Sequence, residues 1–172
     1  MSHVLRVDWA HLVVHKRILD SPNYLREGGK PVIGIKGIGL KGAQQQPEAV
    51  LEIVNQLRVF TPGGAYVLAG GKTGLLARGC LPKLNAQLVS TSWRTPGEGD
   101  HDFNPGFLDV YRQVDAISPW TVGRYRDLDS ADWYAVEMKQ DIKMIRGWNA
   151  TSETHKVHYV PVAFPGLSVR SV

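Results

Sequence analysis

The apolar residues of this chain fall into segments of two alternating kinds. Four segments repeat apolar residues every three to four positions, as amphipathic helices do. Four others are short β-branched or aromatic runs bounded by glycine, proline or polar residues, as buried strands are. The predicted helices cover 3–19, 47–60, 105–114 and 130–148, and the predicted strands cover 31–35, 65–70, 115–120 and 156–166.

Residues at the helix ends support these boundaries. Ser21-Pro22 ends the first helix, because the residue before proline is pushed out of the helical region. Pro47 suits a first helical position. Asn104 and Ser130 are predicted to cap the third and fourth helices.

Helices and strands that alternate along a chain predict parallel strands joined by right-handed crossovers. Two architectures satisfy this order: a small doubly wound sheet, or part of a (β/α)8 TIM barrel. The last two predicted strands end in aromatic and polar residues, at 118–121 and 164–166, and barrel enzymes carry their sites at the carboxyl ends of strands. A full barrel takes about 250 residues, so the prediction is a partial barrel of about four parallel strands alternating with helices.

The segment 71–92 does not fit this alternation. It has weak periodicity, three glycines, one proline and no acidic residue. It also lengthens a strand-to-helix connection well beyond the ~2–6 residues that such loops usually have. The prediction is a single domain over residues 1–172 with an insertion at 71–92.

Composition narrows the class of protein. The chain has 172 residues, of which 43% are hydrophobic and 21% charged, as expected for a globular domain. The net charge of +4 is spread along the chain, which argues against a nucleic-acid partner. No apolar run approaches the ~18 residues of a membrane span. One cysteine excludes an internal disulfide framework. The start lacks the layout of a signal peptide, so the location is left open between the cell interior and a different natural start.

Three motifs are too weak to indicate a nucleotide, metal or nucleophile site. Gly71–Thr73 follows a predicted strand, but the phosphate-binding loop pattern needs a glycine where Tyr66 stands. His11 and His15 share a helix face without a third ligand. Cys80 has no accompanying histidine motif. No metal and no cofactor are therefore expected.

Aromatic and polar residues after the predicted strands form the most informative group. Flat aromatic rings stack on sugar rings, while arginine, hydroxyl and carboxylate groups hydrogen-bond to sugar hydroxyls. An equally weighted alternative is that the tryptophans only anchor loops. The candidate substrate-binding residues are Trp93, Arg94, Ser118, Trp120, Thr121, Arg124, Tyr125 and Asp127.

Five segments resemble a known family. They are SPNYL at 21–25, GKPVIGI at 29–35, SWRT at 92–95, DAISPWTVGRYRD at 115–127 and YVPVAFPG at 159–166. In this order they resemble glycoside hydrolase family 71/99-like domains, which are often labelled xylosidase/arabinosidase and are related to endo-acting α-mannosidases and α-mannanases. The resemblance covers most of 8–166. It implies a barrel that hydrolyses a glycan with acidic residues and no metal, and relatives that are secreted.

Two departures from the family pattern qualify this expectation. The family's acidic E-x-x-E motif does not occur before Val172, and residues 71–92 interrupt a connection that is short in the family. We expect a truncated gene model whose insertion comes from unspliced or misread sequence, and an isolated chain without glycosidase activity. Its catalytic residues stay unassigned, because Asp115 begins a strand at the wrong end and Asp127 alone makes no carboxyl pair.

Other functions remain open: a carbohydrate-binding or structural protein without the chemistry, or a doubly wound domain of unrelated function. A half barrel has open sheet edges and an unfilled interior, which predicts self-association. Asn149-Ala150-Thr151 is a glycosylation sequon that would be usable in a secreted chain.

Overall fold

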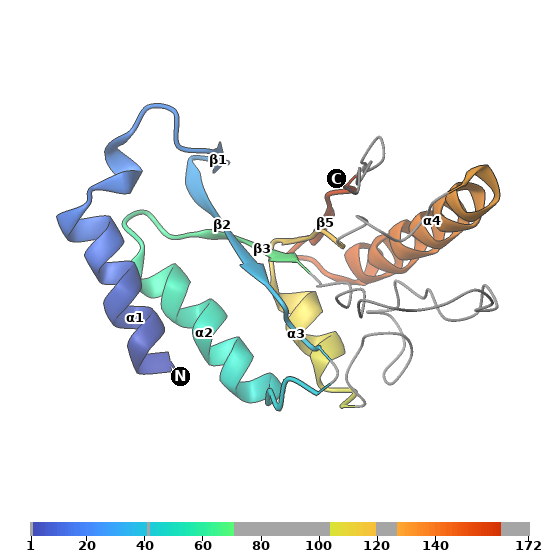
Figure 1. Ribbon diagram of the computed structural model, residues 1–172, viewed down its shortest axis with the longest axis horizontal. Helices are drawn as coiled ribbons and strands as arrows, with labels where there is room; N and C mark the ends of the chain where they lie inside the picture. Colours follow the sequence, from blue (N-terminus) through green and yellow to red (C-terminus); the bar gives the residue numbers. More distant parts are fainter. Residues whose placement is uncertain (1, 41, 71–103, 120–126, 163–172) are drawn as a thin grey trace, which may run out of the picture.

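The computed structural model describes residues 2–40, 42–70, 104–119 and 127–162 of the chain. These residues form a mixed α/β fold with a curled, half-barrel-like sheet of five strands (Figure 1). The elements are α1 (Ser2–Ala10), β1 (Arg26–Glu27), β2 (Lys30–Lys36), α2 (Pro47–Phe60), β3 (Tyr66–Gly70), α3 (Phe107–Gln113), β4 (Ala116–Ile117), α4 (Leu128–Thr151) and β5 (His158–Tyr159).

The strands lie in the sheet in the same order as in the chain. β1 pairs antiparallel with β2, and the pairs β2–β3, β3–β4 and β4–β5 are all parallel. A doubly wound sheet reverses its strand order at a switch point, and the described strands contain no such reversal. The predicted alternation of parallel strands and helices is thus confirmed, and the doubly wound alternative is wrong for this part of the chain. The bounds predicted for the last two strands, 115–120 and 156–166, are too wide, because β4 and β5 have two residues each.

The core lies between one face of the sheet and the helices. Val67, Ala69 and Ile117 point to this face and are at most 1% exposed. They belong to one hydrophobic cluster with Val54 of α2 and Val110 of α3. Because side chains alternate along a strand, the intervening residues face the opposite, concave side of the sheet.

The hairpin of β1 and β2 was not expected, since 27–30 reads as a polar hinge. Gly28 and Gly29 adopt φ values of 54° and 78°, which only glycine takes up without strain. Two consecutive residues of this conformation make the tight turn that suits two twisted antiparallel strands. The turn reverses the chain and lays β1 along the amino end of β2.

The single helix predicted over 3–19 is wrong. α1 ends at Ala10 and passes into a π-helical turn, His11–His15, followed by a short 3₁₀ helix, Ile18–Asp20. Arg17, at φ 51°, breaks the run between them. The apolar spacing that predicted this helix includes Val7 and Val14, and the expectation that they are buried is wrong, because they are 51% and 65% exposed. Leu19, which follows the break, is buried.

Two helix starts differ by a few residues from the prediction. α4 begins at Leu128, and its cap is Asp127, whereas Ser130 occupies the third helical position of a reciprocal capping box. α3 begins at Phe107, and Asn104 instead forms the preceding turn by accepting a hydrogen bond from the Gly106 amide at 2.9 Å. Among the described helices, none is long and apolar enough to cross a membrane.

Candidate functional site

The carboxyl ends of β2, β3 and β4 meet at one edge of the sheet. The Gly37 amide donates to the Gly70 carbonyl at 2.8 Å, and the Ser118 amide donates to the Ala69 carbonyl at 2.8 Å. Lys36, Gly70 and Ser118 each follow a residue that faces the helices, so they share the concave side. A Cβ built on Gly70 would lie 3.4 Å from Cγ of Lys36 and 3.7 Å from the Ser118 carbonyl oxygen. These three positions are therefore immediate neighbours.

The loop after β2 is fastened to the rest of the edge. The Gln45 side-chain amide donates to the Gly37 carbonyl and accepts from the Gly39 amide, both at 2.9 Å. The Tyr111 hydroxyl donates to the Ile38 carbonyl at 2.8 Å, and burial raises the pKa of this phenol. Hydrogen bonds from Gln45 and Tyr111 therefore hold the loop after β2 in place.

Only two of the eight predicted site residues, Ser118 and Asp127, lie in the described part of the chain. Ser118 is half-buried and directly follows β4, at the carboxyl edge. Asp127 is exposed, and its carboxylate accepts from the Ser130 amide at 2.9 Å as the cap of α4. Capping occupies one carboxylate oxygen, so its first role is structural. Trp93, Arg94, Trp120, Thr121, Arg124 and Tyr125 lie outside the described residues.

Asp115 lies at the opposite, amino edge, as the sequence predicted. Its carboxylate accepts from Arg58 Nη2 at 2.8 Å and from the Val67 amide at 2.8 Å. It thereby ties the end of α2 and the start of β3 to the start of β4. A carboxylate that is engaged in this way belongs to the scaffold rather than to a site at the other edge.

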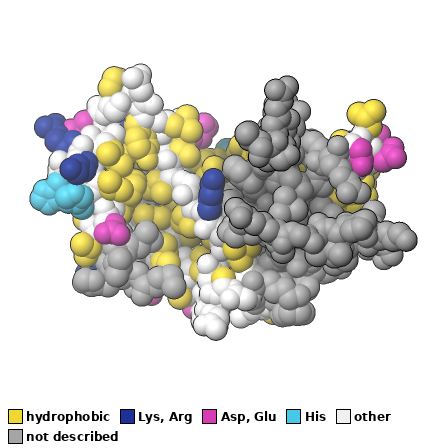
Figure 2. Space-filling view, in the orientation of Figure 1, with side chains coloured by type: hydrophobic (Ala, Val, Ile, Leu, Met, Phe, Trp, Pro, Cys, Tyr) yellow, Lys and Arg dark blue, Asp and Glu magenta, His cyan; other side chains and the backbone are white. Residues whose placement is uncertain are grey.

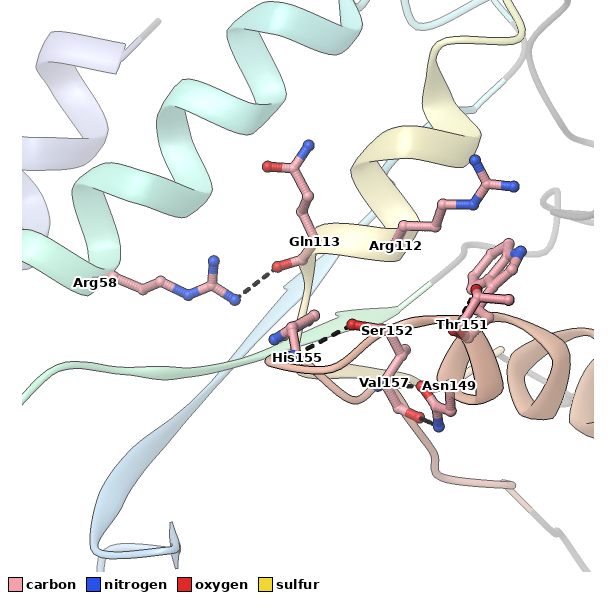
Figure 3. Close-up of a pocket in the computed structure, with 9 residues that line it drawn as sticks. Arg58, Arg112, Gln113, Asn149, Thr151, Ser152, His155 and Val157 are labelled. Atoms are coloured by element: carbon pink, nitrogen blue, oxygen red, sulfur yellow. Dashed lines mark hydrogen bonds between the residues drawn. The ribbon is translucent and has the colours of Figure 1, made fainter.

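A pocket of about 650 Å³ opens at the amino edge, where α2, α3 and α4 end (Figure 3). Its polar groups hold the scaffold together: Arg58 donates to the Gln113 carbonyl at 2.7 Å, and His155 Nε2 contacts the Val114 carbonyl at 2.9 Å. The guanidinium of Arg112 lies 5.1 Å from the ring centre of Trp148. These contacts join the ends of the three helices to one another and the segment before β5 to the segment before β4.

The sequon residue Asn149 also lines this pocket. Its side-chain amide donates to the Val157 carbonyl at 2.8 Å, and its side-chain oxygen accepts from the Val157 amide at 2.9 Å. The nitrogen that would carry a glycan is therefore used to position the chain entering β5. In the folded chain this asparagine is a structural residue.

Sequence reasoning missed a polar pair on the concave face. The Tyr66 hydroxyl and His158 Nδ1 lie 2.7 Å apart, although the residues are 92 positions apart in the chain. Burial, followed by the carboxylates of Glu27 and Asp115, raises the pKa of Tyr66 to about 12. The phenol is therefore protonated at neutral pH, and which of the two groups donates depends on the tautomer of His158. No sequence motif marks a pair of this kind.

The outer helices carry no second site in the described residues. Figure 2 shows hydrophobic side chains over α1 and α2, and here Val7, Val59 and Phe60 are exposed. His11 and His15 have ring centres 5.2 Å apart. Within the described ranges, no group of three or more His, Cys, Asp or Glu side chains is arranged to hold a metal ion.

Comparisons of the chain with protein-family models, with curated proteins and with solved structures find no match.

Proposed function

We propose that the carboxyl edge of this sheet binds carbohydrate, as part of a (β/α)8 barrel of the glycoside hydrolase type. The observation that carries the proposal is the order of the parallel strands. Because β3 and β4 are neighbours, the segments that follow them in the chain start from adjacent points on the same edge. These segments contain SWRT and the PWTVGRYRD run, with the tryptophans and arginines suited to sugar rings.

The described geometry supports a binding role in two ways. Ser118 brings a hydroxyl to the concave side of the edge, and Lys36 lies on the same side of the neighbouring strand. The absence of a side chain at Gly70 leaves room between them, since a Cβ there would contact both neighbours. Polar groups held on rigid strands, beside aromatic residues on loops, are the usual composition of a saccharide site.

The proposal separates binding from hydrolysis. Glycoside hydrolysis uses two positioned carboxyl groups, commonly about 5–10 Å apart. Of the two candidates, Asp115 is engaged at the amino edge and Asp127 caps α4. We therefore expect this chain to bind saccharide without turning it over, as an inactive part of a glycoside hydrolase. The second candidate function is a carbohydrate-binding protein that does not belong to a hydrolase.

Tryptophan fluorescence tests the proposal. Titration with α-mannan, xylan or arabinan oligosaccharides should change the emission of the wild-type chain, and Trp120→Ala should abolish this change. Trp148→Phe is the matched control, because it removes a tryptophan at the amino edge and should leave the titration intact. A folded chain whose emission ignores every saccharide would overturn the binding role.

Activity assays on the same saccharides test the second half of the proposal. We expect no release of reducing ends from the wild-type chain. Turnover that disappears in Asp127→Asn would show that this carboxylate takes part in catalysis and would contradict the separation of binding from hydrolysis.

A further inference from the structure

The pocket at the amino edge is lined by basic and neutral polar side chains. Of the described residues around its volume of about 650 Å³, Arg58, Arg112 and His155 carry basic groups, and none carries a carboxyl group. The groove of about 530 Å³ beside α1 and α2 differs, because two glutamates line it together with one arginine. Sites for small molecules usually measure roughly 300–1,000 Å³. The size and the charge of the amino-edge pocket therefore suit a small anionic ligand.

Arg58 keeps hydrogen-bond donors for such a ligand. A guanidinium carries five N–H donors. Both hydrogen bonds of Arg58, to the Gln113 carbonyl at 2.7 Å and to the Asp115 carboxylate at 2.8 Å, come from Nη2. Nε and Nη1 donate to no residue in the described part of the chain, although the side chain is only 29% exposed. Donors that are buried to this extent are normally hydrogen-bonded, so we expect the pocket to supply an acceptor for them.

Arg112 offers a second set of donors on the other side of the pocket (Figure 3). Its hydrogen bond to Asp109, at 3.2 Å, uses Nη1 and leaves Nε and Nη2 without an acceptor among the described residues. Between the two arginines lies Gln113, whose exposed side-chain amide also bonds to no described residue. The Ser152 hydroxyl, which accepts from the His155 amide at 3.3 Å, keeps a proton to donate. The pocket thus has a cation on each side and neutral hydrogen-bonding groups between them.

The helix ends around the pocket are already paired with cations of the chain. The carboxyl end of a helix carries partial negative charge on its free carbonyls, and α2, α3 and α4 all end here. The Gln113 carbonyl accepts from Arg58, and the carbonyls of Asn149 and Ser152 accept from Lys156 Nζ. Because these carbonyls are satisfied within the chain, their partial negative charge opposes an anionic ligand less.

We propose that the amino-edge pocket binds a small, elongated dianion, an organic molecule with an acidic group at each end and hydroxyl groups between the ends. Each arginine holds one acidic group, because guanidinium groups form charge-assisted hydrogen bonds with carboxylates and phosphates alike. The Gln113 amide and the Ser152 hydroxyl suit the hydroxyl groups in the middle of the ligand. A sugar diacid and a sugar bisphosphate share this chemistry. The site goes beyond the proposed saccharide site, which lies at the opposite, carboxyl edge.

Isothermal titration calorimetry of the full chain at low ionic strength tests the site with three sugar derivatives. Glucarate carries a carboxylate at each end, fructose 1,6-bisphosphate carries a phosphate at each end, and glucitol carries hydroxyl groups only. At least one dianion should bind with a dissociation constant below about 1 mM, and the one that binds more tightly identifies the acidic group. Glucitol should not bind. The proposal is overturned if neither dianion binds at about 10 mM, or if inorganic phosphate binds as tightly as the better dianion.

Arginine-to-alanine variants locate the site. Arg112→Ala removes one of the two cations at an exposed position and should weaken dianion binding about ten-fold or more. Arg146→Ala is the matched control, because Arg146 is exposed on α4, carries the same charge and does not line the pocket. It should change the dissociation constant by less than about two-fold, since distant exposed charges are screened. Equal weakening in both variants would mean that only the net charge of the chain attracts the ligand, and would overturn the site.

A second variant guards against an effect of misfolding. Gln113→Ala shortens an exposed side chain that has no described hydrogen bond, so near-ultraviolet circular dichroism should remain that of the wild-type chain. Dianion binding should weaken several-fold, and an unchanged affinity would contradict the place assigned to the ligand hydroxyl groups. The test is independent of the proposed function. A chain that binds saccharide but neither dianion would overturn this site alone, and a chain that binds a dianion but no saccharide would overturn the binding role of the carboxyl edge alone.

Discussion

Asp115 and Ser118 flank the same short strand and have different surroundings. The carboxylate of Asp115 accepts two hydrogen bonds that fasten α2 and β3 to the start of β4. In the described part of the chain, no residue hydrogen-bonds to the side-chain hydroxyl of Ser118. At the amino edge a polar side chain therefore holds elements together, whereas at the carboxyl edge the Ser118 hydroxyl has no such described contact.

Removing the Asp115 carboxylate should have the largest effect. Asp115→Ala leaves Arg58 without its ion pair and the Val67 amide without its acceptor, which should lower the free energy of unfolding by about 3 kcal/mol. Urea denaturation measures the change. The control is Asp109→Ala, which breaks an exposed pair with Arg112 and should cost less than about 0.5 kcal/mol. Equal losses of stability in the two variants would show that the Asp115 contacts hold the amino edge together no better than an exposed ion pair does.

A side chain at Gly39 should cause the next largest loss of stability. Gly39 has φ 64°, and a Cβ there would lie 2.9 Å from the Tyr111 hydroxyl, so Gly39→Ala should cost about 2 kcal/mol through backbone strain and crowding. Gly42→Ala separates the two causes, because Gly42 has φ 78° but open space around its Cβ. A smaller loss is expected there. If both variants lose the same amount of stability, crowding against Tyr111 contributes nothing to the loss at Gly39.

Asn149→Ala should destabilise the amino edge more moderately. The variant loses both hydrogen bonds to Val157 and should cost about 1.5 kcal/mol. Thr151→Ala also destroys the sequon but leaves the Asn149 amide in place, so thermal unfolding should stay close to wild type. A larger loss for Thr151→Ala would assign the stabilisation to the helix end instead of to the asparagine.

Ser118→Ala should leave stability almost unchanged, within about 0.5 kcal/mol, because no described hydrogen bond is lost. If the carboxyl edge binds saccharide, the same variant should weaken the fluorescence titration several-fold. Denaturation and titration on one sample compare the two effects. A large loss of stability would mean that Ser118, like Asp115, belongs to the scaffold.

Ionisation of Tyr66 should leave the free energy of unfolding unchanged at neutral pH and affect it only in alkali. Its pKa of about 12 lies above the ordinary value of 10, so this phenol favours the folded state fully below pH 10, and the benefit is lost as pH rises toward 12. Glu27→Gln removes a carboxylate that raises this pKa and should move the ultraviolet titration of the phenol to lower pH. An unchanged titration would exclude Glu27 as a cause.

The fold was predictable where its determinants are local. The helix over Pro47–Phe60 follows from its periodicity and its initial proline, and the structure confirms both ends. The parallel order of β2 to β5 follows from the alternation of elements. β1 was missed because two residues are too few to show a pattern, although Gly28-Gly29 is a turn signal.

Contacts between distant residues were not predictable. Arg58 and Asp115 are 57 positions apart, and nothing in their neighbouring sequence indicates that they pair. The break at Arg17 was likewise not predictable, because the helical periodicity continues past it. Of the candidate site, Ser118 lies where the sequence predicted. The tryptophans and arginines stay predictions, because they lie outside the described residues.

Neighbouring strands of this sheet are joined by chain segments of unequal length. β2 ends at Lys36 and β3 begins at Tyr66, whereas the connection from Gly70 to Ala116 is half as long again, yet both pairs of strands form parallel ladders. The entropy of closing a loop grows only with the logarithm of its length, so the longer connection costs about 0.4 kcal/mol more than the shorter one. The sheet can therefore accommodate a segment such as 71–92 at little entropic cost, and selection against such an insertion would have to act through folding speed or function instead of equilibrium stability.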